Sequence, residues 1–141
     1  MTQQEFSGSC LCGSVRFRLA GEIQAFPHCH CSRCRKSTGT GHASNVIVAI
    51  DRFDWECGED LLQRYDVPGA KRFHALFCRQ CGSPMPRVAA DRAVAVIPAG
   101  VLDTAPALEP TGRIFQDSRA AWSCSGDGLP TWDQYPGQPG R

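Results

Sequence analysis

Short runs in which apolar and polar residues alternate recur along the chain. In residues 15–19, three apolar side chains alternate with two arginines, which is the period-two pattern of a half-exposed strand. Comparable runs, separated by Gly, Pro and Asp residues, occupy residues 45–50, 62–66, 73–77, 93–97 and 113–116. Runs of this length, bounded by residues that favour turns, predict short strands in a mainly β domain.

Helical signals are rare and the chain length suits one domain. Only residues 31–37 are predicted to form a short helical turn, and Pro68-Gly69 predicts a turn between two strands. The chain has 141 residues, of which 42% are hydrophobic, so one core is expected and a second domain is not. We therefore expect a single domain over residues 1–141.

The C-terminal part of the chain has a different composition from the rest. From residue 123 onward it is rich in Gly, Pro and polar residues. It is predicted to be an extended cover over the sheet, held by Trp122, Trp132 and Tyr135, with residues 136–141 loose. The core, rather than a substrate site, is the expected location of four aromatic side chains: Phe17, Phe73, Phe77 and Trp122.

Charge and hydropathy exclude several classes of protein. The formal net charge of +1 argues against a nucleic-acid binder, which usually has a strongly basic face. The longest mainly apolar run without a charge, residues 93–102, is far shorter than the roughly 20 residues of a membrane span. Residues 1–8 contain Glu5 and no apolar stretch, so no secretory signal is expected. These features predict a cytoplasmic protein with no nucleic-acid or membrane partner.

Cysteine is the unusual feature of the composition, with nine residues. In a reducing cytosol disulfides seldom persist, and an odd number would leave one thiol unpaired. Seven cysteines form tight clusters, Cys10-x-Cys12, Cys29-x-Cys31-x-x-Cys34 and Cys78-x-x-Cys81, whereas Cys57 and Cys124 stand apart. A C-x-C pair on an extended strand and a C-x-x-C pair on a tight turn each direct two sulfurs to one point. The spacing therefore predicts zinc binding.

Seven clustered cysteines are one too few for two four-sulfur zinc sites, so the simplest division is four plus three. A closed four-cysteine site is structural, whereas three protein ligands with an open position are typical of catalytic zinc. The uninterrupted triplet Cys29, Cys31 and Cys34 is the natural open site, which leaves Cys10 and Cys12 to join Cys78 and Cys81. Spacing leaves an alternative, because a second site could be closed by Cys57, Cys124, His28 or His30.

Positive charge lies directly beside the triplet, at Arg33, Arg35 and Lys36. Three thiolates and one Zn²⁺ carry a net negative charge, which these cations would offset. They are also suited to bind a carboxylate of a ligand, although short basic runs are usually solvated turns. We expect the ligand-binding role, above all for Arg35 and Lys36.

The remaining histidines and cysteines are expected to have structural roles or none. His28 and His30 alternate with the ligand cysteines, so on a strand they point to the opposite face and are expected to pack or to form hydrogen bonds. His42 and His74 have no informative spacing. Cys57 and Cys124 are expected to be free thiols rather than ligands or nucleophiles.

These clusters resemble one known family in sequence and in order. The resemblance rests on C-x-C-G at residues 10–13, C-H-C-x-x-C-R-K at residues 29–36 and F-C-x-x-C-G-S at residues 77–83, with later blocks at 98–103, 113–115 and 119–122. Segments of this kind are similar to those of the glutathione-dependent formaldehyde-activating enzymes, a family that includes centromere protein V. The similarity extends over about residues 6–135, which are then the expected ordered core.

The resemblance implies a β-tent fold and two Zn²⁺ per chain. It places a structural zinc on Cys10, Cys12, Cys78 and Cys81, and a catalytic zinc on Cys29, Cys31 and Cys34. The implied activity is that of a carbon–sulfur lyase, an S-(hydroxymethyl)glutathione synthase that joins glutathione or a similar thiol to formaldehyde or a related small aldehyde. The alternative is a non-catalytic zinc module that binds a protein or chromatin partner, with a fourth protein ligand on the second zinc.

Overall fold

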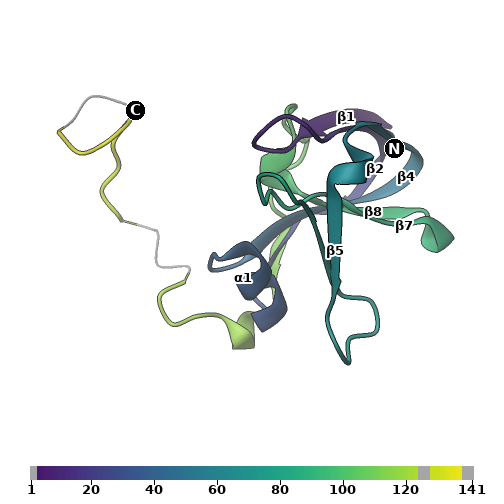
Figure 1. Ribbon diagram of the computed structural model, residues 1–141. Helices are drawn as coiled ribbons and strands as arrows, with labels where there is room; N and C mark the ends of the chain where they lie inside the picture. Colours follow the sequence, from purple (N-terminus) through teal and green to yellow (C-terminus); the bar gives the residue numbers. More distant parts are fainter. Residues whose placement is uncertain (1–2, 124–127, 138–141) are drawn as a thin grey trace.

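The computed structural model describes residues 3–123 and 128–137, and the described chain is mainly β (Figure 1). Its strands are β1 Gln4–Ser9, β2 Arg16–Ala25, β3 Pro27–Cys29, β4 Ala43–Cys57, β5 Leu62–Asp66, β6 His74–Cys78, β7 Arg87–Ala89, β8 Val94–Pro98 and β9 Gly112–Ile114. The helical elements are α1 Ser32–Thr38 and the 3-10 turns η1 Glu59–Leu61, η2 Ala90–Arg92, η3 Ala99–Val101 and η4 Gln116–Ser118. The predicted mainly β class with few helical turns is confirmed. No helix in the described ranges has the length and apolar character needed to span a membrane.

Two sheets organise the strands. The larger sheet has seven strands, with the order β1-β2-β4-β3-β9, while β8 pairs with β4 and β7 pairs with β8. The smaller sheet is the β5–β6 hairpin, in which the two strands pair only with each other. Pairing is antiparallel except between β3 and β9. Strand β4 is the spine of the fold, because β2, β3 and β8 all pair with it.

The sequence pattern found most of these strands but not all. Residues 62–66 form β5 as predicted, and the other five predicted runs overlap β2, β4, β6, β8 and β9. Strands β2 and β4 are considerably longer than predicted, whereas β9 ends at Ile114, two residues before the predicted run does. Strands β1, β3 and β7 were not predicted. In β1, Ser and Gly are poor strand formers, and the segment is extended because every residue from Gln4 to Ser9 pairs with β2.

Alternation along the strands separates a core face from an outer face. Val46 and Val48 of β4 are fully buried, whereas the intervening Ile47 is half-exposed on the other face. Strand β8 repeats the pattern. The largest cluster of buried side chains consists of Phe6, Phe17, Leu19, Phe26, Val46, Val48, Ala95 and Ile97.

Two smaller buried clusters form around cysteines. One contains Cys10, Val15, Cys78 and Met85, and it joins the β1–β2 turn to the β5–β6 hairpin. The other contains Cys29, Cys34 and Ala43, with Cys31 and Phe73 packed against it. The cysteine side chains are therefore part of the packing as well as candidate ligands.

The expected cover over the sheet is wrong. Trp122, Trp132 and Tyr135 are 68%, 56% and 48% exposed, so none of the three side chains is buried against the sheet. Figure 1 shows the C-terminal segment, in yellow, running away from the sheets. The physical reason is that residues 128–137 contain no strand that could pair with a sheet edge. Cys124 and residues 138–141 lie outside the described residues.

The predictions for the other aromatic side chains are confirmed only in part. Phe17 is fully buried as expected, and its ring stacks on Phe53 with 5.8 Å between centroids. Phe73 and Phe77 are only half-buried, and the prediction that Trp122 lies in the core is wrong. Neighbouring Ser123, in contrast, is buried.

Because Phe17 is buried and Trp132 is exposed, truncation to alanine should lower the stability of the protein greatly at Phe17 and hardly at all at Trp132. Phe17→Ala should lower the free energy of unfolding by about 3–5 kcal/mol, because it empties a close-packed site. Trp132→Ala should change it by less than about 0.5 kcal/mol, as is usual for an exposed side chain. Urea denaturation of the metal-loaded protein, followed by circular dichroism, measures both. A large loss with Trp132→Ala would show that the tail packs on the body after all.

Candidate metal centres

Four sulfurs converge where the β1–β2 turn meets the end of the β5–β6 hairpin. The Sγ atoms of Cys10, Cys12, Cys78 and Cys81 all lie within 4.8 Å of one another. The Cys10–Cys12 separation is 3.5 Å and the Cys12–Cys78 separation is 3.9 Å. A tetrahedral zinc with Zn–S bonds of about 2.3 Å spaces its sulfurs about 3.8 Å apart, whereas a disulfide requires about 2.05 Å. The donor set therefore fits one metal ion held by four thiolates.

Two tight turns bring these sulfurs together. The Cys10 N–H donates to the Val15 carbonyl (3.0 Å) and the Gly13 N–H donates to the Cys10 carbonyl (3.0 Å). Cys10 and Cys12 thus lie in a turn, and the expectation of an extended C-x-C strand is wrong here. On the hairpin side, the Gly82 N–H donates to the Cys78 carbonyl (2.7 Å), and Gly82 has a φ of +81°, which favours glycine.

Polar neighbours surround this cluster. Gln80 Nε2 donates to Cys12 Sγ (3.4 Å), and the Ser83 hydroxyl accepts from the Leu11 N–H (2.8 Å) and lies 3.4 Å from Cys81 Sγ. Hydrogen bonds from Ser83 lower the pKa of Cys81 to about 5. Ser14 similarly lowers the pKa of Cys12, whereas burial raises that of Cys78. Ser83 is the last residue of the F-C-x-x-C-G-S motif, although the sequence did not indicate its hydrogen bonds, whereas Gln80 occupies a variable position of that motif and could not be identified from spacing.

A second cluster of three sulfurs lies at the junction of β3, α1 and the pocket beside them. Cys29 ends β3, Cys31 is the N-cap of α1 and Cys34 lies within the helix, with the three Sγ atoms within 4.8 Å of one another. Cys31 Sγ accepts the Cys34 N–H (3.3 Å), in the manner of an oxygen N-cap. The last turn closes at Gly39, whose N–H donates to the Arg35 carbonyl (2.8 Å). The cap and the helix thus fix all three sulfurs relative to one another.

Burial dominates the electrostatics of this cluster. It raises the pKa of Cys34 and of Cys29. At Cys31 burial also acts upward, but hydrogen bonds from Cys34 outweigh it and the pKa of Cys31 is lowered. Thiolates at this site therefore depend on positive charge, a metal ion above all.

Within residues 3–123 and 128–137, no fourth Cys, His, Asp or Glu joins the triplet. His28 stacks on His42 with 3.9 Å between ring centroids, and His30 is buried near the same ring at 5.1 Å. Both histidines thus pack as expected rather than joining the sulfurs. Cys57 is exposed at the end of β4, opposite Arg16, and is a free thiol.

An open pocket of about 490 Å³ lies directly against the three sulfurs. It is lined by Pro27, Cys29, Cys31, Ser32, Arg33, Cys34, Asn45, Ile47, Phe73, Arg87, Ile114 and Phe115. Of the three predicted cations, Arg33 lines the pocket, whereas the half-buried Arg35 and the exposed Lys36 do not. Arg87 could not be predicted as a pocket residue, because β7 has no recognisable strand pattern and no local motif links Arg87 to the triplet.

The structure is thus that of a mainly β protein with two cysteine clusters able to hold metal ions, one of four sulfurs and one of three that faces a pocket. The sequence pattern of the family described as "Glutathione-dependent formaldehyde-activating enzyme" matches residues 5–118. The chain belongs to this family.

Individual relatives agree with this assignment. The chain is 33% identical over 86 residues to a Halomonas elongata protein named "Putative glutathione-dependent formaldehyde-activating enzyme". The match covers 55% of this chain and 52% of that protein, so the chain spans about half the length of its relative. The fold is similar to that in the crystal structure of a Rhodobacter sphaeroides protein, with a TM-score of 0.58, 20% identity, and coverage of 76% of this chain and 98% of that one.

The two clusters predict different consequences of losing one sulfur. We expect reductively prepared protein to carry two zinc ions per chain, measured by elemental analysis. Cys81→Ser should unfold or insolubilise the chain, because structural zinc supplies binding free energy on the order of 10 kcal/mol in small zinc folds. Cys34→Ser should leave a folded protein with one zinc fewer, and Cys57→Ser, outside both clusters, should change neither property.

Thermal unfolding combined with zinc analysis measures all three variants. A content of one zinc or none in the unsubstituted protein would contradict two metal centres. Equal loss of stability in Cys34→Ser and Cys81→Ser would contradict the division into structural and open sites.

The thiol pKa values also predict the order in which acid removes the metals. A thiol must lose its proton to bind metal, so protons displace the ion as the pH falls. In the four-sulfur cluster the pKa values of Cys12 and Cys81 are lowered and only that of Cys78 is raised, whereas in the triplet those of Cys29 and Cys34 are raised and only that of Cys31 is lowered. The triplet also has one sulfur fewer. The triplet should therefore release its zinc at the higher pH. Acid titration with a zinc-sensitive dye checks this in unsubstituted protein and in Cys34→Ser, and loss of the four-sulfur zinc first is the contrary result.

Proposed function

We propose that this protein is a zinc-dependent enzyme that adds a thiol of the glutathione type to formaldehyde or a related small aldehyde. The product with glutathione is S-(hydroxymethyl)glutathione, and the reaction is of the carbon–sulfur lyase class. The observation that carries the proposal is the three-sulfur cluster facing an open pocket, in a chain that belongs to the formaldehyde-activating family. A reducing cytoplasm suits it, because all the cysteines that the structure describes are free thiols.

The reaction is an addition that needs no oxidant or reductant. The S–H bond of the thiol breaks and its proton passes to water. A bond then forms between the sulfur and the aldehyde carbon, the electron pair of the C=O π bond moves to oxygen, and that oxygen takes up a proton from water. Zinc, when bound, supplies the positive charge that keeps a ligand thiol ionised at neutral pH. The protein must therefore bind the thiol beside Cys29, Cys31 and Cys34, orient the aldehyde and stabilise the charge that develops on oxygen.

Cys29, Cys31 and Cys34 would hold the zinc and leave the pocket side free for the substrate. Their three negative charges and soft sulfur atoms suit a further sulfur ligand better than the activation of water. Arg33 and Arg87 line the same pocket and offset the negative charge. Arg35 and Lys36, in the last turn of α1, add positive charge from outside the pocket and interact favourably with the helix dipole.

Asn45 is the polar side chain best placed to meet the aldehyde oxygen. It is buried, at 8% exposure, and it lines the pocket in front of the sulfurs. Its amide N–H groups are donors for a developing oxyanion, a role that amide side chains fill in other acyl and carbonyl chemistry. The proton that completes the alcohol then comes from water that enters the open side of the pocket.

A non-catalytic zinc module is the competing function. It needs a fourth protein ligand at the triplet, and the residues that the structure describes provide none. The open pocket in front of the sulfurs is a further feature that favours a small-molecule substrate.

The test is acceleration of thiol addition above its uncatalysed rate. Exchange NMR with ¹³C-formaldehyde and glutathione should show faster exchange in the presence of zinc-loaded protein. Cys34→Ser should return the rate to the uncatalysed value, because the thiol loses its binding position, whereas Cys57→Ser should retain the full acceleration. Acceleration that survives Cys34→Ser, or that is absent from the unsubstituted protein, would contradict the proposal.

A further inference from the structure

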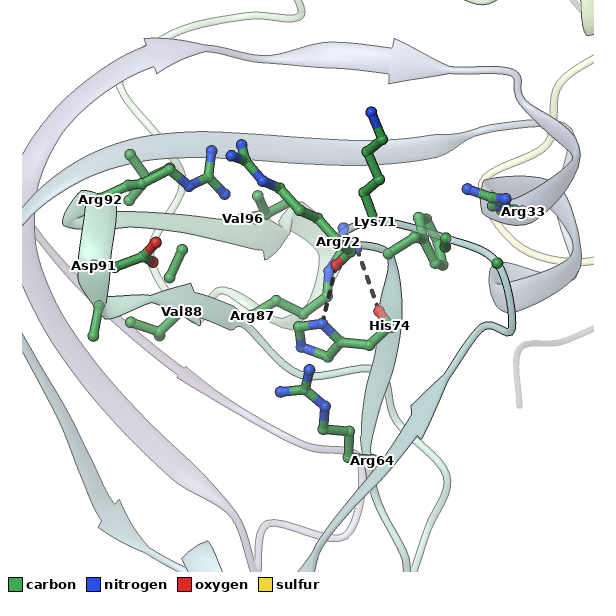
Figure 2. A pocket seen from close by; sticks show the side chains of 16 residues that line it. Arg33, Arg64, Lys71, Arg72, His74, Arg87, Val88, Asp91, Arg92 and Val96 are labelled. Atoms are coloured by element: carbon green, nitrogen blue, oxygen red, sulfur yellow. Dashed lines mark hydrogen bonds between the residues drawn. The ribbon is translucent and has the colours of Figure 1, made fainter.

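A large groove continues from the three-sulfur pocket along the outer face of the main sheet. It encloses about 1010 Å³ and lies between β7–β8 on one side and the β5–β6 hairpin with its loop on the other. Its floor is apolar, with Val94 and Val96 of β8 and Ala89 of β7, the partner of Val94, on the face opposite the core. Figure 2 shows the side chains around it.

The rim of this groove is strongly cationic. Six Arg and Lys side chains line it, namely Arg33, Arg64, Lys71, Arg72, Arg87 and Arg92, with His74, and Asp91 is the only carboxylate among the lining residues. In Figure 2, Arg72 and Arg92 extend into the same region from the hairpin loop and from η2, whereas Lys71 projects away from them. Such clustering of one sign of charge against an apolar floor raises the local concentration of anions.

Most of this charge lacks an acidic partner. Arg64 forms a salt bridge with Asp66 (2.8 Å), so its charge is largely compensated. The other five cations form no salt bridge with any residue in the described parts of the chain. Among the described residues outside the groove, Arg18 and Arg52 pair with acidic side chains, whereas other arginines such as Arg16 and Arg79 do not, so the groove is distinguished by the clustering of its cations. The uncompensated charge of the groove therefore calls for an anionic ligand.

Three residues connect the groove to the sulfur pocket. Arg33, Phe73 and Arg87 line both spaces, so the two are adjoining parts of one surface. The Arg87 guanidinium lies 5.0 Å from the centroid of the Phe73 ring, and its Nη1 donates to the His74 carbonyl (3.4 Å). These contacts hold Arg87 at the junction, within electrostatic reach of Cys29, Cys31 and Cys34.

We propose that this groove binds the oxyanion groups of the thiol substrate, so that the substrate class is anionic thiols. The inference deepens the proposed function and rests on it. The thiol sulfur lies at the three cysteines, the aliphatic part crosses the apolar floor, and carboxylates or phosphates meet Arg72, Arg87 and Arg92. Arg87, at the junction, is the specificity-determining residue, since it can pair with the anionic group nearest to the sulfur.

Calorimetric binding to zinc-loaded protein tests the groove without measuring turnover. The probes are glutathione, coenzyme A as a phosphate-bearing thiol, S-methylglutathione as an anion without a free thiol, and 2-mercaptoethanol as a neutral thiol. Arg72→Ala and Arg87→Ala should each raise the Kd of glutathione by about 10-fold, as expected for a lost charged hydrogen bond. The Kd of 2-mercaptoethanol should not change, and Arg18→Ala, an exposed arginine outside the groove, should leave every Kd unchanged.

The probes also identify the anion and separate the two proposals. Tighter binding of coenzyme A than of glutathione assigns the groove to phosphates, and the reverse assigns it to carboxylates. If the protein has no thiol–aldehyde activity but still binds S-methylglutathione in a way that depends on Arg72, the groove is supported and the proposed function fails. The groove is overturned if Arg72→Ala and Arg18→Ala act equally, or if Arg72→Ala weakens neutral and anionic thiols alike. Arg72 lies on the exposed loop, so its variant is informative even if Arg87→Ala fails to fold.

Discussion

The convergence of four sulfurs from distant segments is the contact on which the other features of this fold depend. The β5–β6 hairpin pairs with no strand of the main sheet, and two-stranded hairpins alone are marginally stable in water. Cys78 and Cys81 hold its end against Cys10 and Cys12 in the β1–β2 turn. The hairpin and its loop in turn supply Phe73 and Arg72 to the pocket and the groove. The convergence of these four sulfurs thus positions one wall of the proposed substrate site.

The two clusters differ in how they stabilise negative charge. Around the four-sulfur cluster, the hydroxyls of Ser14 and Ser83 and the amide of Gln80 are close enough to hydrogen-bond with sulfur, which suits a permanent thiolate site. At the triplet, burial raises the pKa of Cys29 and Cys34, and positive charge must come from a metal ion and from arginines. Burial lowers the pKa of Arg87, and the charge of the three cysteines opposes that effect. The triplet is therefore coupled electrostatically to the groove beside it.

The sequence predicted what is encoded locally and failed where the fold brings distant segments together. Close spacing within each cysteine cluster identified both sulfur sets, and period-two alternation located β2, β4 and β8. Strand β7 is three residues long and is defined only by its pairing with β8, so neither it nor Arg87 could be recognised in advance. The same limit applies to the groove, whose cations come from α1, β5, a loop, β7 and η2. The position of the tail could not be predicted from its aromatic content, because aromatic side chains are not always buried, and Trp132 and Tyr135 are exposed.

A crystal structure of the zinc-loaded protein soaked with glutathione tests the central claim most directly. We expect one metal ion amid the sulfurs of Cys10, Cys12, Cys78 and Cys81, and a second bound by Cys29, Cys31 and Cys34. The glutathione sulfur should be the fourth neighbour of the second ion, with the ligand's carboxylates toward the groove. A fourth protein side chain on that ion, or a glutathione sulfur bound elsewhere, would contradict an open thiol-binding centre.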